Sequence, residues 1–192
     1  HDGSEVELKA TNVVIAAGSD SIELPFAKFD NDTIVDNVGA LDFTAAPKRL
    51  GVIGAGVIGL ELGSVWKRLG SEVTILEALP DFLALADAEV AKTAAKEFKK
   101  QGLDIKLGAK VSKAEVKGKG KSKEVEVTYS DAEGEKTIVV DKLLVSAGRR
   151  AASKGLLAEG TGVKLDARGM VEVDGHCHTG VNGVWAVGGW GR

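Results

Sequence analysis

A G-x-G-x-x-G pattern is the clearest chemical signal in this sequence. It consists of Gly54, Ala55, Gly56, Val57, Ile58 and Gly59. Such a loop predicts binding of a dinucleotide pyrophosphate, because Gly54 permits a tight turn and Gly56 lets the backbone approach the phosphates. Gly59 lets a helix pack closely on the strands. The phosphates would then meet unpaired N–H groups at the positive end of a helix dipole, which favours an anion by about 0.3–1 kcal/mol.

One carboxylate extends this pattern. Glu77 lies at the end of the next apolar strand, 18 positions beyond Gly59. An acid at this point accepts hydrogen bonds from the adenosine ribose hydroxyls and repels a 2′-phosphate. Ala78 and Leu79 follow it without an arginine, so the residues favour NAD over NADP. Two alternatives stay open on the residues alone. The glycines could serve only a tight turn beside a surface carboxylate, and the same fingerprint also binds FAD.

A strand and a helix are expected on either side of the glycine loop. RLGVIGAG is an apolar strand that ends in glycines, and VIGLELGSVWKRLG continues at helical period until Gly70. EVTILEA forms the next strand, which carries Glu77 near its end. The apolar residues expected on the inner face of the helix are Val57, Leu60, Val65 and Leu69.

The order of the remaining elements predicts the fold class. A second helix is expected from Asp87, a favourable N-cap, to Lys100, with Val90, Ala94 and Phe98 spaced four apart. DIKLGAKV gives a third strand, EVEVTYS and KTIVVD form a hairpin, and DKLLVSAG is another apolar strand. This order predicts an α/β fold with a Rossmann-like βαβαβ parallel sheet and a β-hairpin or meander appendage.

The two ends of the chain carry shorter patterns. HDGSEVELKA alternates around a turn and predicts a strand, and NVVIAAG predicts a short buried strand. The stretch 21–48 is irregular. Beyond Arg149, MVEVDG and VWAVGG predict two further strands.

Composition excludes several functional classes. The 192 residues are 44% hydrophobic and 28% charged with a net charge of −3, which argues against a nucleic-acid or anionic-membrane partner. No apolar run reaches the roughly 20 residues of a membrane span, and no signal peptide is apparent. We therefore expect a cytoplasmic protein. The chain begins at His1 rather than Met, which suggests a piece of something longer.

The single cysteine is not expected to do chemistry. Cys177 cannot form an internal disulfide, and a reactive thiol needs an electropositive site and a resolving partner. We interpret it as structural. His176 and His178 flank it, but one pair without further ligands makes a poor metal site, so no metal is expected. The KGKGKSK segment is interpreted as a solvated hairpin loop rather than a polyanion site.

The segment GVIGAGVIGLELGSVWKRLGSEVTILE closely resembles the NAD domain of bacterial dihydrolipoamide dehydrogenases, members of the pyridine nucleotide-disulfide oxidoreductase family. The resemblance continues in order through TNVVIAAGS, TIVDNVGAL, QGLDIKLGAKV, DKLLVSAGRR and DGHCHTGVNGVWAVG. AAGS and GRR are shared with glutathione and mercuric reductases. GLELGSVW and HC-x-T are more particular to the dehydrogenases.

The resemblance implies a role for several residues. The loop 54–59 would hold the NAD pyrophosphate, and Glu77 the adenosine ribose. Val111 would lie beside the adenine and Gly148 near the nicotinamide half. Glu61 would lie close to the nicotinamide, where NAD faces the flavin; from the residues alone it is an acid in the first turn of a helix. The implied domains are an FAD-domain segment and linker at 1–45, an NAD-binding Rossmann domain at 46–149, and a return segment toward the FAD domain at 150–192.

The resemblance also implies an activity to which this chain contributes only the NAD(H)-binding portion. The family oxidises a dihydrolipoyl dithiol through an active-site disulfide, FAD and then NAD, within 2-oxo-acid dehydrogenase complexes. The paired cysteines, the rest of the FAD domain and the interface domain are not in this sequence, so we assign no catalytic residue and expect the chain alone to be inactive. The alternatives are another disulfide reductase of the family and a non-catalytic scaffold fragment.

One position departs from the family pattern. The family ends this segment in VWAVGD, whose aspartate holds the flavin ribityl chain, whereas this sequence has VWAVGG with Gly189 in that place. A hydrogen bond to a charged group contributes about 1.5–3 kcal/mol, so weakened FAD binding is expected even in a complete protein.

Overall fold

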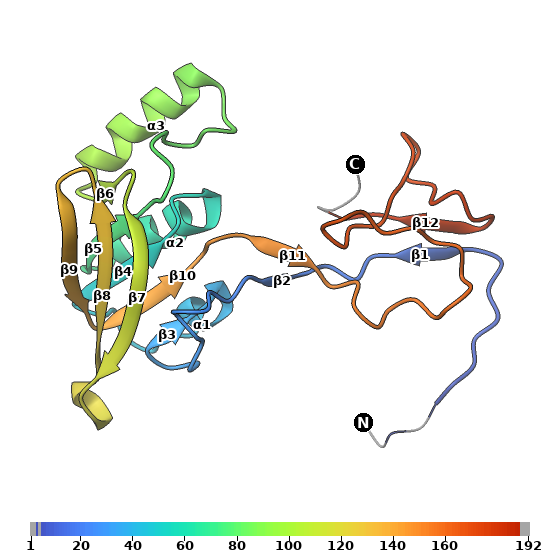
Figure 1. Ribbon diagram of the computed structural model, residues 1–192, viewed down its shortest axis with the longest axis horizontal. Coiled ribbons are helices and arrows are strands. Elements are labelled where there is room, and N and C mark those ends of the chain that lie inside the picture. Colours follow the sequence, from blue (N-terminus) through green and yellow to red (C-terminus); the bar gives the residue numbers. More distant parts are fainter. Residues whose placement is uncertain (1–2, 4, 189–192) are drawn as a thin grey trace. The chain divides into compact units, whose positions relative to one another are not determined.

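The computed structural model describes residue 3 and residues 5–188 (Figure 1). Two compact units are present. One comprises the described residues up to Asp20 together with those from Arg149 onward, and the other comprises Ser21–Gly148. The assignment of 1–45, 46–149 and 150–192 to FAD-domain, NAD-domain and return segments stays a prediction.

The Ser21–Gly148 unit is built on a five-stranded parallel sheet. Its strands in spatial order are β3 (Ile34–Val35), β10 (Lys142–Val145), β4 (Arg49–Ile53), β5 (Glu72–Leu76) and β6 (Asp104–Lys106). Its helices are α1 (Asn37–Leu41), α2 (Val57–Arg68) and α3 (Ala88–Lys100). The expected α/β fold with a parallel sheet is confirmed.

An antiparallel meander forms a second sheet in the same unit. It consists of β7 (Lys110–Lys117), β8 (Glu124–Asp131) and β9 (Gly134–Val140), with a short 3-10 helix at Gly120–Ser122 between the first two strands. The hairpin predicted from EVEVTYS and KTIVVD is β8 and β9, and the lysine and glycine segment joins β7 to β8. The expected appendage is therefore present.

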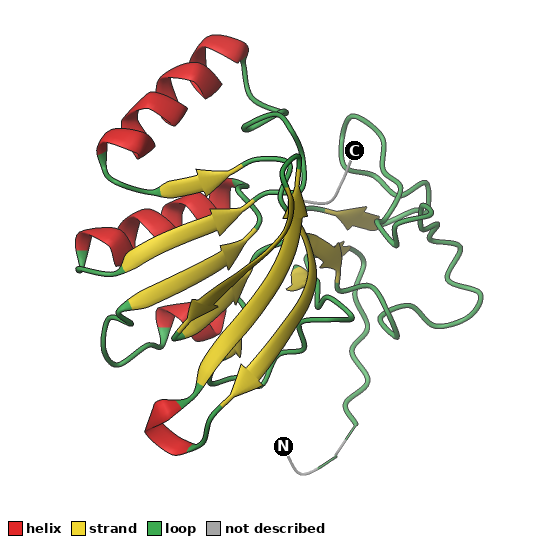
Figure 2. Ribbon diagram, turned by 60° about the vertical axis from the view of Figure 1, so that its left-hand side comes forward, coloured by secondary structure: helices red, strands yellow, loops and turns green. Residues whose placement is uncertain are grey.

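The parallel sheet separates two buried clusters, because alternate residues of each strand point to opposite faces. Val52 and Leu144 lie in one cluster with Leu60 and Trp66 of α2. Ile53 lies in the other cluster, with side chains of the meander. Figure 2 shows the helices and the antiparallel strands on opposite sides of the parallel sheet. The parallel sheet is thus covered on both faces, and the loops at the carboxyl ends of its strands remain at one edge of this three-layer structure.

The inner face of α2 differs from the expected one. Leu60 is buried as predicted, but Val57 is 64% exposed, Leu69 59% and Val65 37%. The buried residues of this helix are Gly59, Leu60, Leu62, Gly63 and Trp66. The reason is close approach at the glycines, since a Cβ added to Gly63 would lie only 3.2 Å from Ile75 Cδ1. Two glycines spaced four apart let the helix axis approach the sheet, and this turns several larger apolar residues outward.

The second helix begins and ends where the sequence predicts. The Asp87 carboxylate accepts hydrogen bonds from the amides of Glu89 (2.9 Å) and Val90 (3.3 Å), and α3 ends at Lys100. None of its residues is fully buried, however, and Val90 is 59% exposed. Phe98 is half-buried and contacts the Phe82 ring edge-on, with 6.4 Å between centroids. The helix thus contacts the core through a narrow part of its surface that includes Phe98.

Three strand predictions need correction. DIKLGAKV is two strands, because Gly108 turns the chain at a φ of +67° between β6 and β7. Residues 5–10 are exposed and form no strand, because no described strand pairs with them to supply the hydrogen bonds of a sheet. MVEVDG forms only an isolated bridge, between Leu165 and Val171.

The other unit contains two short strand pairs. Strand β1 (Val13–Ile15) pairs in parallel with β12 (Val184–Ala186), at the strands expected from NVVIAAG and VWAVGG. The prediction that the first of these strands is buried is wrong, because Val13 and Val14 are exposed. Strand β2 (Ser19–Ser21) pairs with β11 (Arg149–Ala151) where the chain enters and leaves the unit. Among the described residues, no helix has the length and apolarity needed to cross a bilayer.

Candidate functional site

The glycine loop lies at the point where the strand order of the parallel sheet reverses. From β4 the chain passes through α2 to β5 on one side, and it returns through the meander to β10 on the other side. In open parallel sheets, ligands bind in the crevice that this reversal leaves at the carboxyl ends of the strands. Residues 54–56 connect the carboxyl end of β4 to α2 and therefore occupy this crevice.

Two of the three glycines are required by the packing of the chain itself. Gly54 has a φ of +102°, and a Cβ there would lie 2.6 Å from the Ser146 carbonyl oxygen. A Cβ on Gly59 would lie 2.1 Å from the Gly54 carbonyl oxygen. These positions accept no side chain without displacement of the backbone. The predicted reasons for Gly54 and Gly59, a tight turn and close helix packing, agree with this geometry.

Ser146 is a part of the loop's support that the sequence analysis missed. It directly follows β10, and its hydroxyl lies within hydrogen-bond distance of the carbonyl oxygens of Ile53 (3.0 Å) and Gly54 (3.2 Å). The signal for it was available, because a hydroxyl residue directly after an apolar parallel strand lies at the same sheet edge as the glycine loop. Ser146 thus ties β10 to the loop that follows β4.

The middle glycine has a different environment. Gly56 is the N-cap of α2, with a φ of −74° that any residue can adopt, and a Cβ built on it meets no protein atom within 4 Å. No side chain caps the first turn of α2 through a hydrogen bond. The first N–H groups of the helix therefore have no side-chain cap, and Gly56 beside them is exposed.

Glu77 directly follows β5, and its carboxylate bridges two loops. One oxygen accepts a hydrogen bond from the Ala55 amide at 2.7 Å, and the other accepts from the Leu79 amide at 2.9 Å. The carboxylate is thereby held beside the glycine loop by two backbone donors. Four acceptor positions on a carboxylate leave it able to bond further hydroxyl groups.

These residues line a cleft of about 340 Å³. Its volume lies in the range of about 300–1,000 Å³ that is typical of small-molecule sites. The cleft is lined by Ala55, Gly56, Val57, Glu77, Leu79, Asp81, Leu83, Ala84, Leu85 and Ala86. Four of the predicted residues are brought together here. The sequence analysis missed the loop 79–86. The only signal for it in the sequence was its mostly apolar composition between Glu77 and the N-cap of α3.

The other predicted site residues lie outside this lining. Ile58 is half-buried on α2, and Glu61 is exposed in its second turn, not in the first turn as expected. Val111 lies in β7 beside a bulge and packs against the cluster under the meander. Gly148 has a φ of +116°, and its carbonyl oxygen accepts a hydrogen bond from the Ile22 amide at 3.1 Å. Their roles stay predictions.

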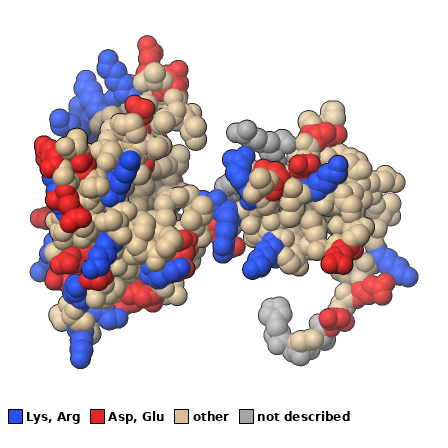
Figure 3. All heavy atoms as spheres, viewed as in Figure 1, with Lys and Arg blue, Asp and Glu red and all other residues tan. Residues whose placement is uncertain are grey.

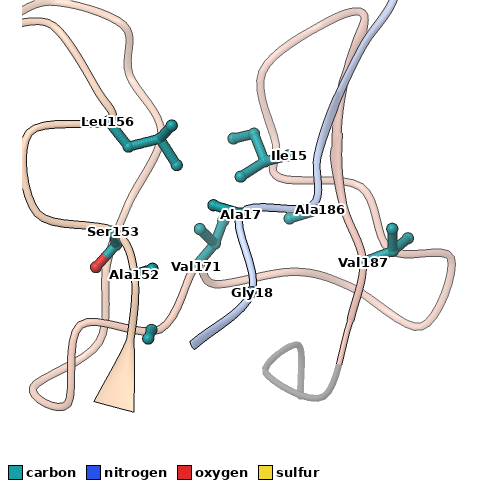
Figure 4. A pocket seen from close by; sticks show the side chains of 10 residues that line it. Ile15, Ala17, Gly18, Ala152, Ser153, Leu156, Val171, Ala186 and Val187 are labelled. Atoms are coloured by element: carbon teal, nitrogen blue, oxygen red, sulfur yellow. The ribbon is translucent and has the colours of Figure 1, made fainter. Parts of the chain in front are cut away.

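A second, smaller cavity lies in the other unit, at the ends of β1 and β12 (Figure 4). Its volume is about 30 Å³, close to that of one water molecule. Apolar side chains line it apart from Ser153, whose hydroxyl donates to the Gly169 carbonyl at 2.6 Å. No chemistry follows from this lining. Gly189, expected to weaken FAD binding, lies outside the described residues.

Cys177 is exposed and forms no disulfide. Its backbone has a φ of +62°, and its carbonyl oxygen accepts a hydrogen bond from the Ala186 amide. His178 contacts the Trp185 ring edge-on, with 5.4 Å between centroids. Within the part of the chain that the structure describes, no three His, Cys, Asp or Glu side chains are grouped so as to hold a metal ion.

Comparison with known proteins gives consistent matches along the chain. The profile of the pyridine nucleotide-disulphide oxidoreductases matches residues 1–190. The dihydrolipoyl dehydrogenase of Cupriavidus necator is 53% identical over 180 residues, which cover 93% of this chain and 37% of that protein. Dihydrolipoyl dehydrogenase 3 of Pseudomonas putida is 46% identical over 187 residues, or 97% of this chain and 40% of that protein. The chain thus spans about two-fifths of the length of these relatives.

Solved structures also resemble this chain in fold. LpdA from Mycobacterium tuberculosis matches with a TM-score of 0.83 and 28% identity, over 97% of this chain and 39% of that one. A Cu(II) complex of a mutant of the HOCl-induced flavoprotein disulfide reductase RclA from Escherichia coli matches with a TM-score of 0.81 and 30% identity, over 98% and 41%.

Proposed function

This chain belongs to the pyridine nucleotide-disulphide oxidoreductase family, and from that premise we propose that its glycine-loop cleft binds NAD(H). The matches confirm the resemblance to dihydrolipoamide dehydrogenases noted in the sequence. In this proposal the chain is the NAD(H)-binding portion of a flavoprotein of that type. The segments 1–45 and 150–192 then belong to its FAD domain, and 46–149 to its NAD domain.

The observation that carries the proposal is the environment of Gly56. Its φ is ordinary, and a Cβ there would meet no atom of the chain, so neither backbone strain nor packing requires glycine. A ligand that approaches the backbone closely does require it. The pyrophosphate of a dinucleotide is such a ligand, because the open N–H groups of α2 and the helix dipole favour an anion there.

Glu77 supports the choice of NAD. Its carboxylate is held by the Ala55 and Leu79 amides beside the loop that would bind the pyrophosphate. From this position it can accept hydrogen bonds from the adenosine ribose hydroxyls and repel a ribose phosphate. Val111 beside the adenine, and Gly148 and Glu61 near the nicotinamide, are the further contacts we propose from the family resemblance.

The chemistry of the whole protein is part of the proposal. Bound NAD⁺ would supply the hydride acceptor, and the residues of this chain would bind and orient it. The sequence contains one cysteine, so the chain alone has no redox-active pair, and we propose that it does not oxidise dihydrolipoamide by itself. FAD, the remaining domains and a 2-oxo-acid dehydrogenase complex are the partners that the named relatives suggest.

Another disulfide reductase of the family is the second candidate, since RclA matches at 30% identity over 98% of the chain. The 53% identity to a dihydrolipoyl dehydrogenase favours the first. A scaffold fragment with an unused cleft is distinguished from both by its failure to bind NADH.

The test is a titration of the chain with NADH and with NADPH, followed by quenching of tryptophan fluorescence. We expect saturable NADH binding and much weaker NADPH binding. Glu77→Gln should weaken NADH about tenfold or more, because a hydrogen bond to a charged acceptor contributes about 1.5–3 kcal/mol. Glu72→Gln is the matched control, as it removes the same charge at the other end of β5. No NADH binding at millimolar concentration would contradict the proposal.

A further inference from the structure

The cleft has a charge pattern that Glu77 alone does not explain. Two of its lining residues are charged, Glu77 and Asp81, and both are acidic. Asp81 lies in the exposed loop after Glu77, and no hydrogen bond or ion pair engages its carboxylate within the described part of the chain. No Lys or Arg is among the residues that line the cleft.

The loop that carries Asp81 is anchored on both sides of it. Before it, the Leu79 carbonyl accepts a hydrogen bond from the Gly108 amide at 2.9 Å, and the Leu79 amide donates to Glu77. After it, Phe82 and Leu83 pack against the buried cluster under α2. The Asp81 carboxylate is therefore kept at the cleft rather than on a freely moving segment.

The turn that follows fixes the remainder of the loop. Leu83 has a φ of +48°, which non-glycine residues rarely adopt, and its carbonyl oxygen accepts a hydrogen bond from the Ala86 amide at 2.8 Å. The next residue, Asp87, caps α3. A residue in the left-handed region persists only where its surroundings determine it, which indicates a defined conformation for 79–86.

The basic residues of this region lie elsewhere. Figure 3 shows Lys side chains gathered over α3, whose last turn contains Lys99 and Lys100. Lys106, at the end of the neighbouring strand β6, pairs with Asp104 at 3.0 Å. A ligand in the cleft would thus meet two carboxylates without a lining cation to offset them.

We infer that Asp81 is a second specificity-determining residue, which acts with Glu77 to exclude dinucleotides that carry a phosphate on the adenosine ribose. The inference rests on the proposed NAD(H) function of this cleft. A ribose phosphate monoester carries about 1.5–2 negative charges at pH 7, and both carboxylates repel it. Glu77 both accepts hydrogen bonds and repels, whereas Asp81 has no bonding role and acts through its charge alone.

This division of roles gives the two residues different signatures. Removal of the Asp81 charge should strengthen binding of the phosphorylated cofactor more than binding of NADH, because both cofactors carry the pyrophosphate but NADH has no charged group at that ribose position. Removal of the Glu77 charge should weaken NADH as well. Since Asp81 is exposed, its repulsion should be screened by salt.

The experiment measures dissociation constants of NADH and NADPH for the whole chain, for Asp81→Asn and for Glu77→Gln, at low (~20 mM) and high (~500 mM) salt. We expect Asp81→Asn to bind NADPH about 3- to 10-fold more tightly at low salt, with NADH changed less than about twofold and a smaller effect at high salt. AMP and adenosine 2′,5′-bisphosphate, used as short probes, should show the same difference. Glu72→Gln removes one exposed charge at the amino end of β5, opposite the end that Glu77 follows, and is the matched control.

The results distinguish failure of the Asp81 inference from failure of the proposed NAD(H) binding. If Asp81→Asn leaves the ratio of NADPH to NADH affinity unchanged, or if Glu72→Gln alters it equally, Asp81 has no specific role while the proposed function stands. If the unaltered chain does not bind NADH, the proposed function fails and this inference fails with it. Circular dichroism of each variant verifies that the exposed substitution leaves the fold intact.

Discussion

A Cβ on Gly59 would lie 2.1 Å from the carbonyl oxygen of Gly54, and 2.7 Å from the Ser146 hydroxyl. Gly59 thus sets how closely α2 approaches the strand before it. A Cβ built on Gly56, three residues earlier, would meet no protein atom within 4 Å. Two glycines of one motif therefore carry separable constraints, one from the fold and, under the proposed function, one from the ligand.

Alanine substitutions should separate these constraints. Gly59→Ala forces a backbone shift in a packed region, and we expect a loss of about 3 kcal/mol or more in the free energy of unfolding. Gly56→Ala should cost less than about 1.5 kcal/mol, the scale of an N-cap change, yet weaken NADH binding strongly. Urea denaturation and an NADH titration on both variants check this. Equal destabilisation by the two substitutions would contradict the separation.

Substitution of Trp66 tests how much the buried, unpaired indole N–H costs in stability. It is 7% exposed, its ring lies 5.3 Å from Phe43, and its indole N–H has no hydrogen-bond partner within the described residues. Trp66→Phe removes a donor whose burial costs about 1–3 kcal/mol, and this offsets the lost volume. We expect the free energy of unfolding to change by less than about 1 kcal/mol, whereas Trp66→Ala should cost about 3–5 kcal/mol. Chemical denaturation of the two variants measures both, and a Phe variant as unstable as the Ala variant would show that the donor is satisfied.

Asp32 should give a small, acid-sensitive contribution to stability. Hydrogen bonds from Lys142 and Lys123 lower its pKa from 3.8 to about 2. Because the folded-state pKa is depressed, the contribution is present above about pH 4 and is lost as pH falls from there toward 2. Its side chain is 52% exposed, so solvent screening limits the contribution to less than about 1 kcal/mol.

The measurement is the difference in unfolding free energy between the unaltered chain and Asp32→Asn at several pH values. The difference should be largest near neutral pH and vanish near pH 2. A difference that stays constant across this range would show that Asp32 acts through something other than its charge.

The strand pair β1 and β12 should promote self-association. Val13 is 47% exposed and Val14 58%, on a sheet of two parallel strands, which is rarely stable without further covering. We expect oligomers in sedimentation velocity and binding of a hydrophobic dye, both reduced in a Val13→Thr/Val14→Thr variant. Val116→Thr, on the exposed side of β7, serves as the control. A monodisperse monomer that binds no dye would contradict this expectation.

The sequence predicted the strands β4, β5 and β10 and both ends of α3, because glycines, Asp87 and apolar runs are local signals. It missed β3 and α1, which lie in the stretch 21–48 that was interpreted as irregular. It predicted the buried face of α2 poorly. Val57 and Leu69 are larger and more apolar than Gly63, yet Gly63 is buried and they are exposed. Hydrophobic periodicity records side-chain size and polarity, and close approach of a helix to a sheet instead selects for the absence of a side chain.

For the candidate site too, only the features with a local sequence signal were predicted. Gly56 and Glu77 were visible as a motif, and the structure brings them into one cleft. Ser146 and Asp81 were not, because their positions depend on strand order and on a loop whose conformation is set by tertiary contacts. Residues 5–10 and 170–175 alternate like strands, but an alternating pattern forms a strand only where a partner edge exists.

The hydrogen bond between Ser146 and Gly54 joins residues 92 positions apart in the chain. Closing so long a loop is entropically costly, and contacts of this separation form late relative to local helices and hairpins. During synthesis, the glycine loop would leave the ribosome long before β10, the strand that supports it. A nascent chain that ends before Lys142 would therefore carry the complete G-x-G-x-x-G motif without the support of β10. Under the proposed function, affinity for the dinucleotide would arise only once the meander has folded and β10 has been inserted between β3 and β4.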